Sequence, residues 1–325
     1  MQTVYVDRRD AELGFERGAL CIRIPGEPPK TVPIRGVERL IVRTGARLSA
    51  TLLAELWRRD AGVLVLAGRS REAAARFAGR PRKDLELRLR QYELVRDPDR
   101  RLAFAREIVA AKLAAHARLH RRLAEEGQGQ RLRIQEAAER LARLAEQAMT
   151  SKSLETLLGH EGTGAAVHFE AYATLFPPSL RFTGRNRRPP RDPVNACLSL
   201  AYTLLHFEAV RRLQMHGFDP MLGSLHAPAS GRESLACDLV EPLRAHIDRW
   251  VYERFRKREL RRRDFRWSGE ACYLEKGGRR RFYEAYEKIA PVLARLLARM
   301  CRNLARELRA RVPPAVVLEE DEEER

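Results

Sequence analysis

Two segments of the chain carry acidic and imidazole side chains that could do chemistry. In the first, Glu161 stands between Gly159-His160 and Gly162, and glycines on both sides allow the backbone to approach a ligand closely. In the second, His226 is followed twelve residues later by Asp238 and then by Glu241. On a helix, residues three apart share one face, so the carboxylates of Asp238 and Glu241 repel each other unless a cation or an arginine neutralises them.

These residues leave two interpretations open. In the plain one, Glu161 is exposed at a helix–helix turn, and His226 forms a salt bridge with its acidic neighbours. In the chemical one, Glu161, His226 and Glu241 form one site, with Asp238 alongside. Oxygen ligands with one imidazole and no thiolate suit a hard divalent ion, Mg²⁺ or Mn²⁺, better than structural zinc. Such an ion stabilises charge on phosphoryl oxygens and activates a hydroxyl or water, as phosphodiester chemistry requires.

A basic segment lies between these two acidic ones. It surrounds Pro189-Pro190 with five arginines: Arg181, Arg185, Arg187, Arg188 and Arg191. Asp192 and Pro193 then form a typical helix start, with the aspartate as N-cap and the proline at the first helical position. Asn195 and Tyr202 are polar exceptions on the apolar face of this helix. Arginines in a loop against a helix N-terminus favour phosphate binding, and a solvated basic loop is the alternative.

The composition supports a polyanionic partner. The 325 residues carry a formal net charge of +18, with a sequence pI near 10.4. The hydrophobic fraction of 44% is large enough for packed cores. The early charged residues predict that there is no signal peptide, and no apolar run approaches the roughly 20 residues of a membrane span. We therefore expect a nucleic acid rather than a membrane as the partner.

Five dispersed cysteines argue against both a disulfide framework and a zinc finger, because their number is odd and none forms a C-x-x-C pair. Several of them lie in apolar helical stretches and are interpreted as small core residues. This usage fits a reducing cytoplasm.

The chain divides into two regions of different periodicity. Residues 1–80 are predicted to form a small β-rich domain, with strands at 3–6, 12–16, 19–24, 37–42 and 62–66 and one helix capped by Ser49. The Arg17-Gly18 pair predicts a hairpin. Residues 81–318 are predicted to be all-helical, beginning with a helix marked by Leu85, Leu89 and Tyr92. Longer helices are expected at about 100–125, 130–149, 151–176, 193–216, 234–257 and 280–311. The acidic run 319–325 is interpreted as a disordered tail. The fold class is therefore α+β.

Three ordered motifs make the chain recognisable. They are Leu157-Leu158-Gly159-His160-Glu161-Gly162, then Arg188-Pro189-Pro190-Arg191-Asp192-Pro193-Val194-Asn195 followed by Tyr202, and finally Gly217-Phe218-Asp219-Pro220, Gly223-Ser224-Leu225-His226 and Leu235-Ala236-Cys237-Asp238-Leu239-Val240-Glu241-Pro242. In these motifs the chain resembles the CRISPR-associated endonucleases and integrases of the Cas-one family, over nearly its whole length. It departs from the family at Ser224 and at Ala227-Pro228, where no lysine follows closely and Arg232 supplies a positive charge.

The resemblance implies a function in antiviral defence. A β-rich domain would mediate homodimerisation, and a helical domain would hold Mg²⁺ or Mn²⁺ through Glu161, His226 and Glu241, with Asp238 as an auxiliary residue. The dimer would assemble with the small Cas-two protein on double-stranded DNA and join 3′-hydroxyls to the CRISPR array by transesterification. The residues expected to bind DNA are Arg185, Arg187, Arg188, Asn195, Tyr202, Arg232, Arg258 and Arg262.

Two rival functions remain to be separated from this one. A structure-selective nuclease of branched DNA would use the same residues without joining strands. A non-catalytic DNA-binding scaffold would need the positive charge but not the Glu161, His226 and Glu241 set.

Overall fold

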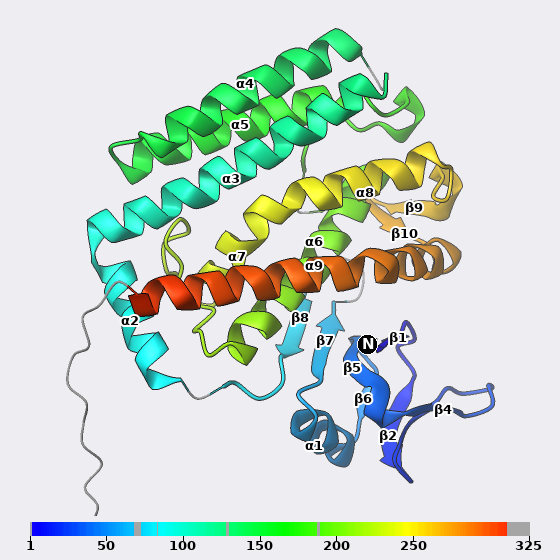
Figure 1. Cartoon of the computed structure of the whole chain (residues 1–325). Coiled ribbons are helices and arrows are strands. Elements are labelled where there is room, and N and C mark those ends of the chain that lie inside the picture. Colours follow the sequence, from blue (N-terminus) through cyan, green and yellow to red (C-terminus); the bar gives the residue numbers. More distant parts are fainter. Residues whose placement is uncertain (1, 68–72, 83, 128–129, 187–188, 311–325) are drawn as a thin grey trace, which may run out of the picture.

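The computed structural model of the chain describes residues 2–310, except for 68–72, 83, 128–129 and 187–188 (Figure 1). Arg187 and Arg188, which were predicted to bind DNA, lie outside the described residues, as does the acidic run 319–325.

The N-terminal unit contains two four-stranded sheets and one helix. Its elements are β1 (Gln2–Val6), β2 (Glu12–Glu16), β3 (Ala19–Arg23), β4 (Lys30–Pro33), a 3₁₀ turn (Ile34–Gly36), β5 (Val37–Arg43), β6 (Arg47–Leu48), α1 (Ala50–Arg58), β7 (Gly62–Leu66) and β8 (Ala73–Phe77). One sheet has the order β1-β5-β7-β8, and the other has the order β4-β3-β2-β6. The predicted strands are therefore confirmed.

Local chemistry explains two of these elements. Arg17 and Gly18 both have positive φ, at 48° and 79°, as a tight β-hairpin turn requires, and they join the antiparallel strands β2 and β3. The hydroxyl of Ser49 accepts a hydrogen bond of 3.2 Å from the Leu52 backbone N–H, so this serine caps α1 as predicted.

The β1-β5-β7-β8 sheet is covered on both faces. Val4, Leu40 and Val63 pack into a core shared with the second sheet and α1, whereas Ile41 and Leu64 join the core of the helical unit. Gly62 belongs to this second contact, because a Cβ there would lie 2.7 Å from the Phe207 ring. The helical unit therefore covers the face of this sheet that α1 and the second sheet leave open.

The C-terminal unit is mostly helical, which confirms the predicted fold class. It comprises α2 (Leu85–Arg96), α3 (Pro98–Glu125), α4 (Arg131–Met149), α5 (Leu154–Ala173), α6 (Pro193–Met215), α7 (Ser234–Val240), α8 (Arg244–Arg256) and α9 (Lys276–Ala310), with 3₁₀ turns at Pro178–Leu180, Glu241–Leu243 and Arg262–Asp264. A short hairpin of β9 (Phe265–Ser268) and β10 (Ala271–Leu274) interrupts this unit, which was expected to be all-helical. In Figure 1, α3, α4 and α5 run side by side, and α9 crosses below them.

A buried ion-pair network joins the two units. Arg39 on β5 reaches Glu208 on α6 at 3.4 Å and Glu287 on α9 at 3.3 Å. Tyr5 on β1 stacks on Tyr283 of α9, with 4.2 Å between ring centroids. Within the described residues, no helix combines the length and the apolar character that crossing a membrane requires.

Candidate functional site

Two of the three predicted metal ligands meet at one lysine. Glu161 lies on α5, and Glu241 begins the 3₁₀ turn that follows α7. The ammonium of Lys112, on α3, lies 2.6 Å from Glu241 Oε2 and also forms an ion pair with Glu161 Oε1. Three helical segments therefore place two carboxylates around a single positive charge.

The surroundings keep Glu241 ionised. Burial raises the pKa of this carboxyl, but the guanidinium of Arg244 and the ammonium of Lys112 lower it, and the net result lies well below the usual range. Arg244 Nε donates a hydrogen bond of 2.9 Å to Glu241 Oε2. Glu241 is therefore a carboxylate at neutral pH, although only 4% of the residue is exposed.

His226 is held by Asp238. The His226 Nδ1 atom lies 2.7 Å from Asp238 Oδ1, which also accepts the backbone N–H of His226 at 3.0 Å. The other oxygen, Oδ2, accepts the backbone N–H groups of Ser224 and Leu225. With both oxygens engaged in a fully buried position, Asp238 orients the imidazole, and Nε2 is the ring nitrogen left for a ligand.

Local packing explains the motif that carries His226. A Cβ at Gly223 would lie 2.5 Å from the backbone of Ser234 and 2.8 Å from Asp238, so only glycine allows the loop to approach α7 this closely. Leu225 is buried with Leu113 of α3 and Leu157 of α5. This contact fixes the loop against the two helices that carry Lys112 and Glu161.

The predicted metal ligands Glu161, His226 and Glu241 do not converge as closely as a second group of possible ligands does. Among the described residues, three possible ligand atoms converge within 4.8 Å at His116, His168 and Asp248. The ligand atoms of Glu161, His226 and Glu241 do not meet this limit, and the ammonium of Lys112 lies between the two carboxylates. Sequence reasoning missed Lys112, although Lys112, His116 and His120 repeat every four residues along an otherwise Ala/Leu-rich helix.

Asn195 and Arg185 form hydrogen bonds that stabilise the loop before α6. Asn195 is fully buried; its side chain donates to Gly184 O at 2.8 Å and accepts from Arg185 Nη1 at 2.7 Å. Arg185 also donates to the hydroxyl of Ser199 at 3.0 Å. The hydrogen-bonding groups of Asn195 therefore serve the loop that precedes α6, and its contact with DNA stays a prediction.

Tyr202 also faces the protein interior. Its hydroxyl donates a hydrogen bond to Asp248, and its ring lies beneath the guanidinium of Arg244, 4.6 Å from the ring centroid. Burial raises the pKa of Tyr202 well above its usual value, so the hydroxyl remains a donor. Tyr202 therefore connects Asp248 to Arg244.

Exposed arginines form a separate basic surface near the β9–β10 hairpin. Arg258 and Arg262 are exposed, and Arg262 lies over the Trp267 ring at 5.2 Å. Arg254 differs from them, because it is buried and pairs with Glu259 at 2.8 Å. Arg232 is half-buried and donates to the backbone carbonyl of Ala227 beside His226.

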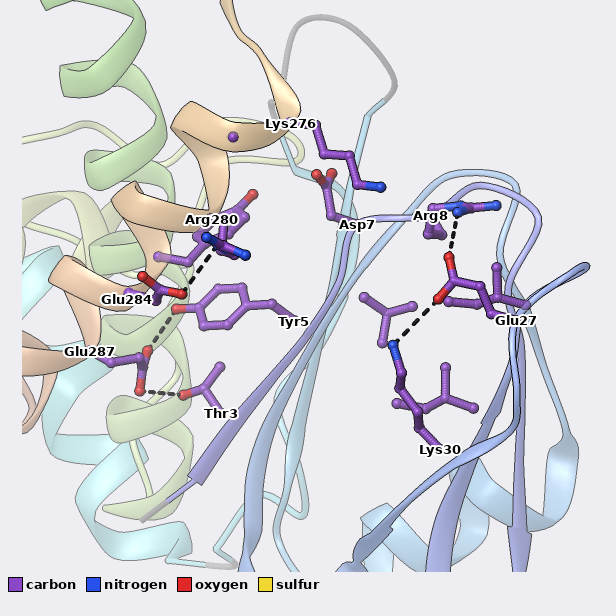
Figure 2. Close-up of a pocket in the computed structure, with 15 residues that line it drawn as sticks. Thr3, Tyr5, Asp7, Arg8, Glu27, Lys30, Lys276, Arg280, Glu284 and Glu287 are labelled. Atoms are coloured by element: carbon purple, nitrogen blue, oxygen red, sulfur yellow. Dashed lines mark hydrogen bonds and ion pairs between the residues drawn. The ribbon is translucent and has the colours of Figure 1, made fainter. Parts of the chain in front are cut away.

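A large cavity lies elsewhere, between β1 and the start of α9. It has a volume of about 930 Å³ and is lined by Thr3, Tyr5, Glu287 and several charged residues. Figure 2 shows that these charges are largely paired with one another, as in Arg8–Glu27 and Arg280–Glu284. This cavity contains none of the predicted site residues.

Known proteins share this arrangement of the chain. Residues 4–288 match the family described as CRISPR associated protein Cas1. A CRISPR-associated endonuclease Cas1 of Thermodesulfovibrio yellowstonii is 35% identical over 291 residues, which cover 89% of this chain and 91% of that protein.

Solved structures share the fold. A Cas1 protein from Thermotoga maritima superimposes with a TM-score of 0.83 at 21% identity, covering 98% of this chain and all of that one. A casposase bound to an integration product superimposes with a TM-score of 0.79 at 19% identity, covering 94% and 91% of the two chains. From the family match and the relative together, the chain belongs to the Cas1 family of CRISPR-associated proteins.

Proposed function

We propose that this protein is a CRISPR adaptation integrase: a divalent-metal-dependent DNA endonuclease and strand transferase that inserts short foreign DNA into the CRISPR array. The observation that carries the proposal is the meeting of Glu161 and Glu241 at one cation, together with a histidine that is held in place by Asp238, three residues before Glu241. Family membership supports it, and a casposase bound to an integration product has the same fold.

The residues present fit a hard divalent ion. Two carboxylates that together attract one ammonium form a site for positive charge, and the third donor is an imidazole with one nitrogen already engaged. Glu161, His226 and Glu241 would hold Mg²⁺ or Mn²⁺. The ion would stabilise charge on the phosphoryl oxygens during attack by a 3′-hydroxyl or by water.

The remaining residues position this set and the DNA. Asp238 fixes the ring orientation of His226, and Arg244 holds Glu241 by a hydrogen bond of 2.9 Å. Arg258 and Arg262 face solvent, where their guanidinium groups can contact phosphates without reading bases. Arg185 and Asn195 stabilise the loop that carries further arginines.

The proposed partners follow from the family. We propose a homodimer formed through residues 1–80, assembled with the Cas2 protein on double-stranded DNA. Two subunits would supply two copies of the Glu161, His226 and Glu241 set, one for each 3′ end of a short duplex.

Strand joining tests the proposal directly. A short duplex with free 3′-hydroxyls is incubated with repeat-bearing DNA, with and without Mn²⁺, and covalently joined strands are separated on denaturing gels. We expect joining by the natural protein, and none by Glu161→Ala, His226→Ala or Glu241→Ala. Glu155→Ala, an exposed position on the same helix as Glu161, is the matched control and should keep activity.

The other outcomes identify the rivals. Cutting of branched DNA without joined products would indicate a structure-selective nuclease. DNA binding without any metal-dependent product would indicate a scaffold. Either result contradicts the integrase proposal.

A further inference from the structure

A buried cluster of two histidines and one aspartate lies inside the helical unit. His116 on α3, His168 on α5 and Asp248 on α8 are at most 4% exposed. The Nε2 atoms of both histidines lie 3.1 Å from the same oxygen, Oδ2 of Asp248. Three helices therefore direct three possible ligand atoms at one point.

Hydrogen bonds alone do not account for this cluster. His116 is hydrogen-bonded to Asp248, but the His168 Nε2 atom lacks hydrogen-bond geometry at the same distance and has no other partner. The two imidazole nitrogens thus point at one common oxygen, Asp248 Oδ2, rather than at each other. A buried imidazole nitrogen without a partner is unfavourable, so it calls for an occupant.

The donor types suit metal ligation. His168 is buried, and its Nδ1 lies 2.9 Å from His120 Nε2, so Nε2 is the ring nitrogen that faces Asp248. Asp248 is also buried, and its Oδ1 accepts the hydroxyl of Tyr202, which leaves Oδ2 facing the two histidines. Two imidazoles with one carboxylate form a donor set typical of zinc sites.

We propose that His116, His168 and Asp248 bind one Zn²⁺ ion at a site separate from the catalytic one. Donors bound to zinc at about 2.0–2.2 Å in tetrahedral geometry lie roughly 3.3 Å apart, close to the 3.1 Å between each histidine nitrogen and Asp248 Oδ2. His120 Nε2 lies 2.9 Å from His168 Nδ1 and would accept its proton, which orients the ring for ligation.

The two sites stack along the same helical segments. His116 follows Lys112 by four residues, His168 follows Glu161 by seven, and Asp248 follows Glu241 by seven. At 1.5 Å per residue, the first two spacings correspond to about 6 Å along α3 and about 10 Å along α5, which is too far for the paired ions of two-metal catalysis. The buried ion would instead clamp α3, α5 and α8 beneath the catalytic carboxylates.

Metal content tests the inference on the full-length protein. The chain is purified without added metal, its zinc is measured by plasma mass spectrometry, and the metal-free form is titrated with Co²⁺ as a spectroscopic probe. To exclude the catalytic site, the measurement is repeated in a Glu161→Gln/Glu241→Gln variant. We expect one zinc per chain in both proteins, and the intense visible bands of four-coordinate Co²⁺.

Three further variants locate the ion. His168→Gln and His116→Gln should each lower zinc affinity by more than tenfold, and His120→Gln by about 10–100-fold. His246→Gln, which removes an exposed histidine of α8, should keep the full zinc content. Two results together would overturn the inference: a natural protein that contains no zinc, and Co²⁺ bands that are absent from the Glu161→Gln/Glu241→Gln variant. These results would decide the matter even if the His168→Gln protein did not fold.

Discussion

Replacing Lys112 with methionine removes an ammonium that contacts both Glu161 and Glu241. Two oxygens that touch a common nitrogen lie no more than about 5 Å apart. At an effective dielectric constant of about 20, two negative charges at that distance repel by roughly 3 kcal/mol. In metal-free buffer, we expect Lys112→Met to lower the free energy of unfolding by about this amount, which corresponds to a fall in Tm of roughly 6 °C.

Metal should reverse this loss. In Lys112→Met, a divalent ion meets two carboxylates without first displacing an ammonium. Mn²⁺ at about 100 times its Kd would then add roughly 2.7 kcal/mol and restore most of the lost stability. Thermal unfolding followed by fluorescence, with and without Mn²⁺, measures both effects. The rise in Tm on adding Mn²⁺ should be larger in Lys112→Met than in the natural protein.

Lys152→Met is the matched control, because Lys152 is exposed and the substitution is the same. It should leave both Tm and the response to Mn²⁺ unchanged. Equal unfolding of Lys112→Met and Lys152→Met, with an equal response to Mn²⁺, would refute the view that Lys112 occupies the place of a cation between two catalytic carboxylates.

Three other predictions follow from the described contacts. Asp238→Asn should weaken metal binding by about 10–100-fold, and excess Mn²⁺ should restore its strand joining. Glu241→Gln should stay inactive at any Mn²⁺ concentration. Equal rescue of both variants would show that Asp238 has no orienting role. The pKa of Glu241 is lowered in the folded protein, so its stabilising effect is present above its unfolded pKa of about 4.3 and is lost as pH falls further. The difference in free energy of unfolding between the natural protein and Glu241→Gln should therefore shrink on acidification below that pH. A constant difference in urea unfolding would contradict this. Arg258→Ala/Arg262→Ala should reduce the slope of log K against log salt by about 2 in DNA-binding titrations, and an unchanged slope would place the DNA elsewhere.

The sequence correctly predicted those elements whose conformation is set by a few neighbouring residues. The Arg17-Gly18 turn and the Ser49 cap are set by a few neighbouring residues, and both are confirmed. The buried face of α2 was harder to predict, because two apolar rows compete: Leu85 and Leu89 are 73% and 54% exposed, while Leu87 lies inside. Gln91 explains the choice, since its amide binds the carbonyls of Asp219 and Leu222, and no local pattern contains that long-range contact.

The candidate site was predictable as a set of residue types but not as a geometry. The motifs named Glu161, His226 and Glu241, and their roles as metal ligands stay predictions. Lys112 escaped notice because a lysine in a long helix ordinarily faces solvent, and its burial depends on α5 and the turn after α7 meeting α3. Asn195 was recognised as a polar exception on an apolar face, but its hydrogen bonds to Gly184 and Arg185 depend on the fold of the preceding loop, which no local pattern contains.

The ion pairs of Arg39 have a consequence for the modularity of the chain. The two units are joined mainly by side chains, Arg39 with Glu208 and Glu287 and Ile41 with the helical core, rather than by the connector near residue 80. We therefore expect the two halves, made as separate polypeptides, to associate through these contacts. Conversely, a chimera that exchanges residues 1–80 between relatives would have to carry over the matching acidic positions of α6 and α9.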